Sequence, residues 1–330
     1  MPEPNKLLQG LGIPFAAFIS VIFGLMILSF PVGAYIIFNS TIENDINFDY
    51  PLNEIDFFPT ENAFKIPVDL ELGDAFIVIW SVFVIIFTIA MFGPKTNFLR
   101  SIMPIMMEGK REPKSNYLVA VIKWFCILIV VSSIIIFVQD SFGIKTQAPE
   151  SPNVLIQFFK VTLAPITEEI SFRVLLIGIP LYAMYTQKSS IHLFFKSLWH
   201  PAEFINEYQL KRVIILITVI GIFFGAAHII SGEPWSLGKF AQATASGIII
   251  GWVYFRHGLI SAILVHWATN YFIFSYVYLI ADINEFSIQN AFSQSLTHTM
   301  EILFIITGAI TIAMMIINYV NLKKEKKLEI

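Results

Sequence analysis

Long apolar segments alternate with shorter polar links along the whole chain. The apolar segments cover residues 12–38, 75–93, 117–138, 164–185, 213–231, 238–255, 258–280 and 300–320. A helix needs about 20 apolar residues to cross the hydrocarbon layer of a bilayer. None of these segments alternates polar and apolar residues as the strands of a membrane barrel do. The pattern therefore predicts an all-α polytopic membrane protein, a bundle of eight transmembrane helices.

The composition agrees with a membrane protein. Of the 330 residues, 56% are hydrophobic and 14% are charged, whereas soluble domains contain about 25% charged residues. The only cysteine, Cys126, lies within an apolar segment. A single cysteine excludes an intrachain disulfide and a zinc site built from cysteines, so we expect Cys126 to be a packing residue. We expect no nucleic-acid partner.

The polar links alternate in charge, and this predicts an orientation. The link over about residues 39–74 is acidic, and the C-terminal tail reads NLKKEKKLEI. The second link is basic, with Lys95, Arg100, Lys110, Arg111 and Lys114. Because Lys and Arg favour cytoplasmic loops, we expect both termini in the cytoplasm and the acidic link outside. The expected location is a prokaryotic cell membrane. The basic tail is expected to contact anionic lipid.

Ionisable residues lie inside one apolar segment, where each costs about 2.5–3.5 kcal/mol near the bilayer centre. The stretch APITEEISFRVLL, residues 164–176, contains Glu168, Glu169 and Arg173. Glu169 and Arg173 share a helix face and can pair, while Glu168 lies about 100° around the helix and can point into the bundle. The structural alternative is an ion-paired cluster in the first turn of a helix that Pro165 begins.

Two further segments carry polar residues that can reach the same depth. His228 lies near the end of the segment GIFFGAAHII, and LISAILVHWATNYF contains His266 and Asn270, four residues apart. At 1.5 Å per residue, His266 lies about 12 Å from the cytoplasmic end of its segment. We therefore expect an active-site cavity within the membrane, in the central-to-outer half of the bilayer. The remaining histidines are expected at the surface: His192, His200, His257 and His298.

This set of side chains has two chemical uses. A glutamate and a histidine can activate water as general bases, while a second histidine and an amide can donate hydrogen bonds to an oxyanion. Alternatively, Glu168, His228 and His266 supply three zinc ligands and leave a fourth position open for water. The sequence contains no HExxH, GxSG or GxGD motif, which excludes three other classes of intramembrane protease.

Three ordered motifs carry a family resemblance. EExxxR, FxxxH and HxxxN occur in this order on three segments, and residues 240–270 form a glycine-spaced helix leading to the last motif. Together they resemble the CPBP family (CAAX protease and bacteriocin-processing, or Abi), which includes the type II CAAX prenyl endopeptidases. The resemblance covers roughly residues 155–275. It implies an eight-helix enzyme with its site inside the membrane.

The resemblance also implies a role for each motif residue. Glu168 activates water, His228 assists it, and His266 with Asn270 stabilises the oxyanion. Glu169 and Arg173 support the site, and Phe224 shapes its wall. Members of the family have been described both as metalloproteases and as metal-free enzymes. We favour no metal and keep zinc as the alternative, with Glu168, His228 and His266 as its ligands.

The sequence divides into two parts. Residues 1–150 contain three N-terminal transmembrane helices and the acidic link, and residues 151–330 contain a CPBP-like protease core of five transmembrane helices and the basic tail. The expected activity is hydrolysis of a peptide bond in a membrane-embedded or lipidated protein or peptide, including a prenylated CAAX-type substrate. Two alternatives remain: a proton-coupled transporter that uses the Glu/His/Arg cluster, and a non-catalytic family member that binds a membrane partner.

Overall fold

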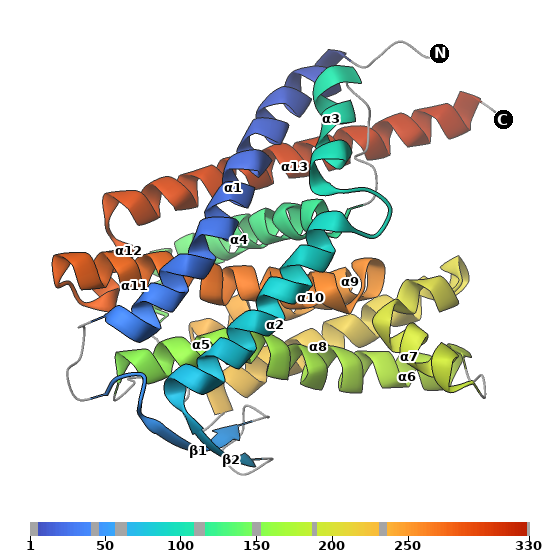
Figure 1. The fold of residues 1–330 in the computed structure, drawn as a ribbon. Helices are drawn as coiled ribbons and strands as arrows, with labels where there is room; N and C mark the ends of the chain where they lie inside the picture. Colours follow the sequence, from blue (N-terminus) through green and yellow to red (C-terminus); the bar gives the residue numbers. More distant parts are fainter. Residues whose placement is uncertain are drawn as a thin grey trace.

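The protein is a bundle of helices with one small β-hairpin, as the computed structural model shows (Figure 1). The structure describes residues 6–40, 46–56, 65–108, 116–146, 153–186, 190–230 and 236–328. The N-terminal part contains α1 (Lys6–Asn39), α2 (Leu72–Phe92), α3 (Phe98–Glu108) and α4 (Tyr117–Ser141). Next come α5 (Val154–Glu168), the π-helix η1 (Glu169–Gly178), α6 (Ile179–Leu181) and the π-helix η2 (Tyr182–Thr186).

The C-terminal part continues with short elements and then long helices. The short elements are α7 (Ile191–Trp199) and the 3₁₀ helices η3 (Pro201–Phe204) and η4 (Glu207–Gln209). They are followed by α8 (Leu210–Ile230), α9 (Lys239–His257), α10 (Leu259–Trp267), the π-helix η5 (Ala268–Phe272), α11 (Ile273–Asn284), α12 (Ile288–Phe292) and α13 (Ser295–Leu328). Within the described residues, each of the eight predicted apolar segments therefore lies almost entirely in helices.

Six of the helical segments within the described residues are long and apolar enough to cross a membrane. They are Gly10–Asn39, Leu72–Phe92, Tyr117–Ser141, Glu207–Ile230, Leu259–Asn284 and Ser295–Asn321. The predicted spans 164–185 and 238–255 are not among them, so the count of eight is not confirmed. The first is divided between α-helical and π-helical turns, and α9 carries Lys239, Gln242, Thr244 and Ser246 in its first two turns.

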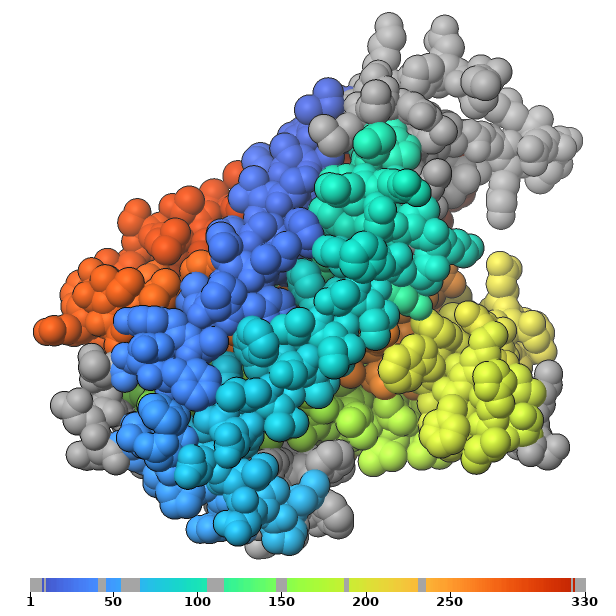
Figure 2. Space-filling view, in the orientation of Figure 1, coloured from blue at the N-terminus to red at the C-terminus, as the bar shows by residue number. Residues whose placement is uncertain are grey.

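Hydrophobic side chains cover much of the outer surface. On α2, Val78 is 60%, Ile85 60% and Phe92 61% exposed. Figure 2 shows α1, α2 and α3 side by side on this face of the molecule. Large apolar side chains at this exposure are unfavourable in water over so wide an area, and they suit contact with lipid tails.

The acidic link contains a hairpin that the all-α prediction missed. Strand β1 (Pro51–Asp56) pairs antiparallel with β2 (Lys65–Glu71), in a register that sets Pro51 opposite Glu71 and Asp56 opposite Lys65. The register shifts between Leu52 and Glu54. In β2 the apolar residues Ile66, Val68 and Leu70 alternate with Pro67 and Asp69. This alternation is typical of a β-strand, whose successive side chains point to opposite faces. Residues 41–45 and 57–64 of the predicted link, and residues 329–330 of the tail, lie outside the described residues.

Glycines bring α8 and α9 into close contact. A Cβ added at Gly247 would lie 3.0 Å from the Cα of Gly221, and one added at Gly221 would lie 2.9 Å from the backbone nitrogen of Ile248. A Cβ added at Gly225 would likewise come too close to α9, at 2.9 Å from the Phe240 carbonyl oxygen and 3.0 Å from the Thr244 backbone nitrogen. Small residues at such spacing let membrane helices approach backbone to backbone. The two helices are therefore held antiparallel in a fixed register.

The N-terminal helices pack directly on the segment that carries the last motif. The Tyr271 hydroxyl donates to the carbonyls of Ser29 at 3.0 Å and Phe30 at 3.1 Å, both in α1. Gly33 makes room for it, since a Cβ there would overlap the hydroxyl. Trp267 stacks on Phe30, with ring centroids 5.2 Å apart. We call Phe30, Phe87, Trp267 and Tyr271 the aromatic cluster.

Candidate active site

The two carboxylates lie where one helix changes its winding. The Asn153 side chain accepts hydrogen bonds from the backbone N–H groups of Leu155 and Ile156, at 2.8 and 3.0 Å, and begins α5 there. The expectation that Pro165 begins this helix is therefore wrong, because Pro165 lies inside α5. Glu168 ends α5 and Glu169 opens the π-helical η1. The alternative of a first-turn carboxylate cluster fails for the same reason.

Glu169 and Arg173 form the expected ion pair in the interior. The Arg173 Nε lies 3.0 Å from Glu169 Oε2, and the two side chains are 1% and 0% exposed. The Arg173 guanidinium also lies over the Phe224 ring, 4.7 Å from its centroid, a favourable cation–π geometry. A buried ion pair needs such additional contacts to offset the loss of hydration.

The second oxygen of Glu169 has a partner that the sequence did not reveal. His266 Nδ1 lies 2.8 Å from Glu169 Oε1. A carboxylate oxygen accepts, so Nδ1 carries the hydrogen in this bond. Glu169 therefore links Arg173 to His266 and fixes the orientation of the imidazole ring. The two partners are 97 residues apart in the chain, and no spacing rule connects them.

The other ring nitrogen of His266 points at Glu168 and Asn270. His266 Nε2 lies 3.9 Å from Glu168 Oε2 and 3.4 Å from Asn270 Nδ2. The Glu168 side chain is 16% exposed, and its Oε2 is buried without a hydrogen-bond partner in the protein. Buried oxygens normally have such a partner. Glu168 Oε2 is therefore available to accept a proton from a reactant.

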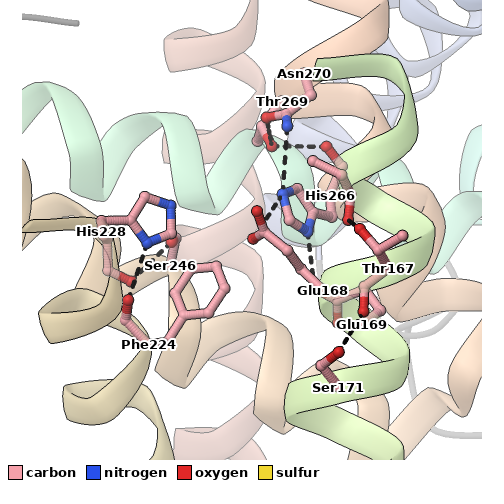
Figure 3. Close-up of polar contacts among 12 residues, drawn as sticks. Thr167, Glu168, Glu169, Ser171, Phe224, His228, Ser246, His266, Thr269 and Asn270 are labelled. Atoms are coloured by element: carbon pink, nitrogen blue, oxygen red, sulfur yellow. Dashed lines mark hydrogen bonds and ion pairs between the residues drawn. The ribbon is translucent and has the colours of Figure 1, made fainter. Parts of the chain in front are cut away.

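His228 lies beside the Phe224 ring, on a different helix from Glu168 and His266. Its Nδ1 donates to the Phe224 carbonyl at 2.9 Å, which leaves the lone pair on Nε2 in a neutral ring. The Phe224 ring centroid lies 4.6 Å from that of His228 and 6.2 Å from that of His266. In Figure 3 the Glu168 carboxylate projects between the two imidazole rings. The structure thus gathers all seven sequence-selected residues around one point.

Two histidines predicted at the surface are partly buried. The Tyr117 hydroxyl lies 3.1 Å from His200 Nε2, and burial lowers the pKa of His200 below its ordinary value. His257 Nε2 accepts a hydrogen bond from Trp124 Nε1 at 3.1 Å. Both imidazoles form their hydrogen bonds with aromatic side chains of α4, and neither is part of the site around Glu168. His192 and His298 are exposed as predicted.

A metal site requires several His, Cys, Asp or Glu side chains that converge on one position. Within them, no group of three or more His, Cys, Asp or Glu side chains is placed to hold a metal ion. In the alternative set Glu168, His228 and His266, the Phe224 ring lies near both imidazoles, with its centroid 4.6 Å from that of His228 and 6.2 Å from that of His266. Metal dependence stays a prediction.

The comparisons with known proteins agree with the three motifs. Residues 150–272 match the family model described as type II CAAX prenyl endopeptidase Rce1-like. The chain carries an Rce1-like domain. Neither the curated proteins nor the solved structures include a match to this chain. The Rce1-like domain contains every motif residue from Glu168 to Asn270. Together with the six apolar helices, it makes this an integral membrane protein.

Proposed function

We propose that the protein is an intramembrane endopeptidase that hydrolyses a peptide bond of a membrane-embedded or lipidated substrate, with prenylated CAAX-type proteins as one class. The observation that carries the proposal is the buried Glu168 Oε2, which has no hydrogen-bond partner in the protein and lies 3.9 Å from His266 Nε2. A carboxylate with this environment is suited to take a proton from water. The Rce1-like domain supports the reaction class.

Glu168 and His228 act on the water. Glu168 Oε2 takes one proton, and the oxygen of the resulting hydroxide attacks the substrate carbonyl carbon. His228 Nε2, with its lone pair directed away from the Phe224 carbonyl, accepts a second hydrogen bond from the same water. Glu168 then returns the proton to the amide nitrogen as the C–N bond breaks. The products are a new carboxyl group and a free amine, and no covalent enzyme intermediate forms.

His266 and Asn270 act on the oxyanion that forms during attack. The Asn270 Nδ2–H group is one donor. The His266 Nε2–H group is the second when the ring carries both protons, because Glu169 holds Nδ1–H at 2.8 Å. Donors fixed in this way stabilise the developing charge without reorganising, and each is worth about 10²–10³ in rate. The Glu169–Arg173 pair keeps the ring in place.

In the proposed topology all eight apolar segments cross the membrane and both termini are cytoplasmic. The site then lies in the outer half of the bilayer, which favours membrane-embedded or exported peptides as substrates. The exposed Lys323 begins the basic tail, which we propose contacts anionic lipid. The location of this membrane in a prokaryotic cell is part of the same proposal.

Cleavage of defined peptides tests this function. Purified protein in nanodiscs is incubated with membrane peptides, with and without a prenylated C-terminal CAAX sequence, and the products are identified by mass spectrometry. We expect specific cleavage that Glu168→Gln abolishes and that Glu207→Gln, an exposed carboxylate on η4, leaves unchanged. Proton or solute flux through liposomes without any cleavage would instead support a transporter, and binding without either would support a non-catalytic role.

A further inference from the structure

The short helix α7 exposes a stripe of large apolar side chains. Ile191, Phe195 and Trp199 are 73%, 62% and 44% exposed, and they recur every fourth residue, which places them along one side of the helix. At 1.5 Å per residue the 9 residues of α7 extend only about 13 Å, whereas the hydrocarbon layer is about 30 Å thick. The stripe is therefore not part of a transmembrane crossing.

The opposite side of α7 is fixed to the protein. Ser197 and Leu198 are buried, and the Phe194 ring meets the edge of the Tyr182 ring, with centroids 4.9 Å apart. The Tyr254 hydroxyl, from α9, donates a hydrogen bond to the Leu198 carbonyl at 2.7 Å. These contacts fix the rotation of the helix about its axis, so the stripe faces outward in the folded protein.

A third side of α7 is polar. His192 and Lys196 are exposed, and at about 100° per residue they follow the stripe around the helix, between it and the side that packs on the protein. The Lys196 Nζ lies 2.9 Å from Glu203 Oε2, so an ion pair borders this side. The helix therefore presents three different surfaces in turn: protein contacts, apolar side chains and polar side chains.

The surface of α8 shows where the hydrocarbon layer begins. Lys211 and Arg212 are exposed in the first turn of α8, and the exposed side chains that follow them are apolar, Ile214 and Ile215. Charged side chains are costly within hydrocarbon, whereas exposed apolar side chains suit it. The boundary between headgroups and acyl chains therefore lies near the first turn of α8.

The contact between α8 and α9 relates this boundary to α7. A Cβ added at Gly251 would lie 3.0 Å from the Ile217 side chain. Because the two helices are antiparallel, Tyr254, one turn after Gly251, is level with Ile214. Tyr254 also holds the Leu198 carbonyl, so the end of α7 lies near the boundary between headgroups and acyl chains.

We propose that α7 is an interfacial helix, which inserts Ile191, Phe195 and Trp199 among the acyl chains at the membrane surface and keeps His192 and Lys196 among the headgroups. Helices with large apolar and aromatic side chains on one face and basic residues on another lie in the membrane surface in this way. The proposal does not depend on peptidase activity. It also holds for either number of crossings, because α8 is a crossing in both and α7 lies beside its end.

The depth of spin labels tests the proposal on the whole protein. Single cysteines in a Cys126→Ala background are labelled in nanodiscs that carry one copy of the protein, and their accessibility to oxygen and to a water-soluble nickel chelate is measured. Phe195→Cys is compared with Ile85→Cys, an exposed position on the crossing α2, and with Glu54→Cys on the hairpin. We expect the label of Phe195→Cys at a depth of about 5–10 Å, between the two references, and that of His192→Cys closer to water.

Four results would overturn the proposal. The label of Phe195→Cys could be as accessible to nickel as that of Glu54→Cys, or as deep as that of Ile85→Cys. Neither reagent could reach it, which would show that protein covers the stripe. Protection that arises only in nanodiscs with two copies would assign the stripe to a second copy of the chain.

Polar substitution of the stripe gives a second test. Ile191→Gln/Phe195→Gln should lower the melting temperature in nanodiscs, because two polar side chains would then enter an apolar environment. Glutamine favours a helix at least as strongly as isoleucine and phenylalanine, so a loss of helix propensity cannot cause this decrease. His192→Gln, on the polar side of the same helix, is the matched control and should leave the melting temperature unchanged. An unchanged or higher melting temperature in the double variant would place the stripe in water and overturn the proposal.

Discussion

Glu169 is the residue on which the geometry of the site depends. One oxygen contacts Arg173 at 3.0 Å and the other contacts His266 at 2.8 Å, so a single buried carboxylate holds both the ion pair and the imidazole. The sequence predicted the first contact from the spacing of four residues. It could not predict the second, because a contact between two helices depends on how they pack. The convergence of Glu168 with His266 was predicted only as a common depth in the bilayer.

Substitution of the four central residues tests their proposed roles. Single changes Glu168→Ala, His228→Ala and His266→Ala should each abolish peptide cleavage while the protein remains folded. Asn270→Ala should keep measurable activity, because one lost oxyanion donor costs about 10²–10³ in rate. Turnover and the melting temperature are measured together, with the exposed His298→Ala as control. Full activity in any of the first three variants would remove that residue from the mechanism.

Breaking the buried ion pair should destabilise the protein more than removing it. Arg173→Gln leaves the Glu169 carboxylate short of a charged partner in the interior, which costs about 3–5 kcal/mol. Glu169→Gln/Arg173→Gln should melt at a higher temperature than the single variant. The double variant should nevertheless be less active than the wild type, because a neutral amide holds His266 Nδ1–H less firmly. A double variant as unstable as Arg173→Gln would refute the pairing.

Metal content distinguishes the two chemical uses of the site. We expect protein purified without added metal to be active, to lack stoichiometric zinc by elemental analysis and to keep its activity in the presence of a chelator. Stoichiometric zinc that is lost together with activity, and that restores activity when returned, would contradict this expectation. It would make Glu168, His228 and His266 the ligands.

At the level of elements, the unexpected feature is that two motifs lie at π-helical turns. Glu169 opens η1, and Asn270 lies within η5. Such turns are frequent at functional sites, but an apolar pattern with a period near four residues does not distinguish them from an α-helix. The helices themselves could be predicted, since their length and apolar character are local properties. The start of α5 was missed because the capping residue Asn153 lies eleven residues before the predicted segment.

The glycine contact between α8 and α9 should be needed for the position of His228. Gly247→Leu inserts a side chain where a Cβ already lies 3.0 Å from the Gly221 Cα, so the helices must separate, at a cost of about 1–3 kcal/mol. We expect a lower melting temperature and a loss of activity larger than the loss of stability explains. Gly24→Ala, where the added Cβ meets nothing within 4 Å, is the matched control. Unchanged activity in Gly247→Leu would show that this register does not matter to the site.

At the level of the whole molecule, the number of membrane crossings determines the side on which each link lies. Eight crossings and six crossings both place the β-hairpin outside and both termini inside, because the two counts differ by two. They differ for the link that contains η4. With eight crossings this link is cytoplasmic. With six crossings, the segments 164–185 and 238–255 do not cross the membrane, and the link is external.

Labelling of single cysteines distinguishes the two counts. In a Cys126→Ala background, which removes a buried thiol, we expect Glu54→Cys to react with an impermeant maleimide in intact cells. Glu207→Cys should react only after the membrane is permeabilised. Reaction of Glu207→Cys in intact cells would establish the count of six and place His228 at the cytoplasmic end of α8. Glu54→Cys serves as the internal standard for access from outside.

The hydroxyl of Tyr271 bears on how this protein can be divided. The recognisable family segment ends at residue 272, but Tyr271 and Trp267 are packed on rings and carbonyls that belong to α1 and α2. A fragment that begins near residue 150 would leave these groups facing lipid, directly beside Asn270. The smallest working unit is therefore larger than the unit that sequence comparison detects. An engineer who transplants this site must carry the N-terminal helices with it, either in one polypeptide or as a separately expressed piece that assembles on the core.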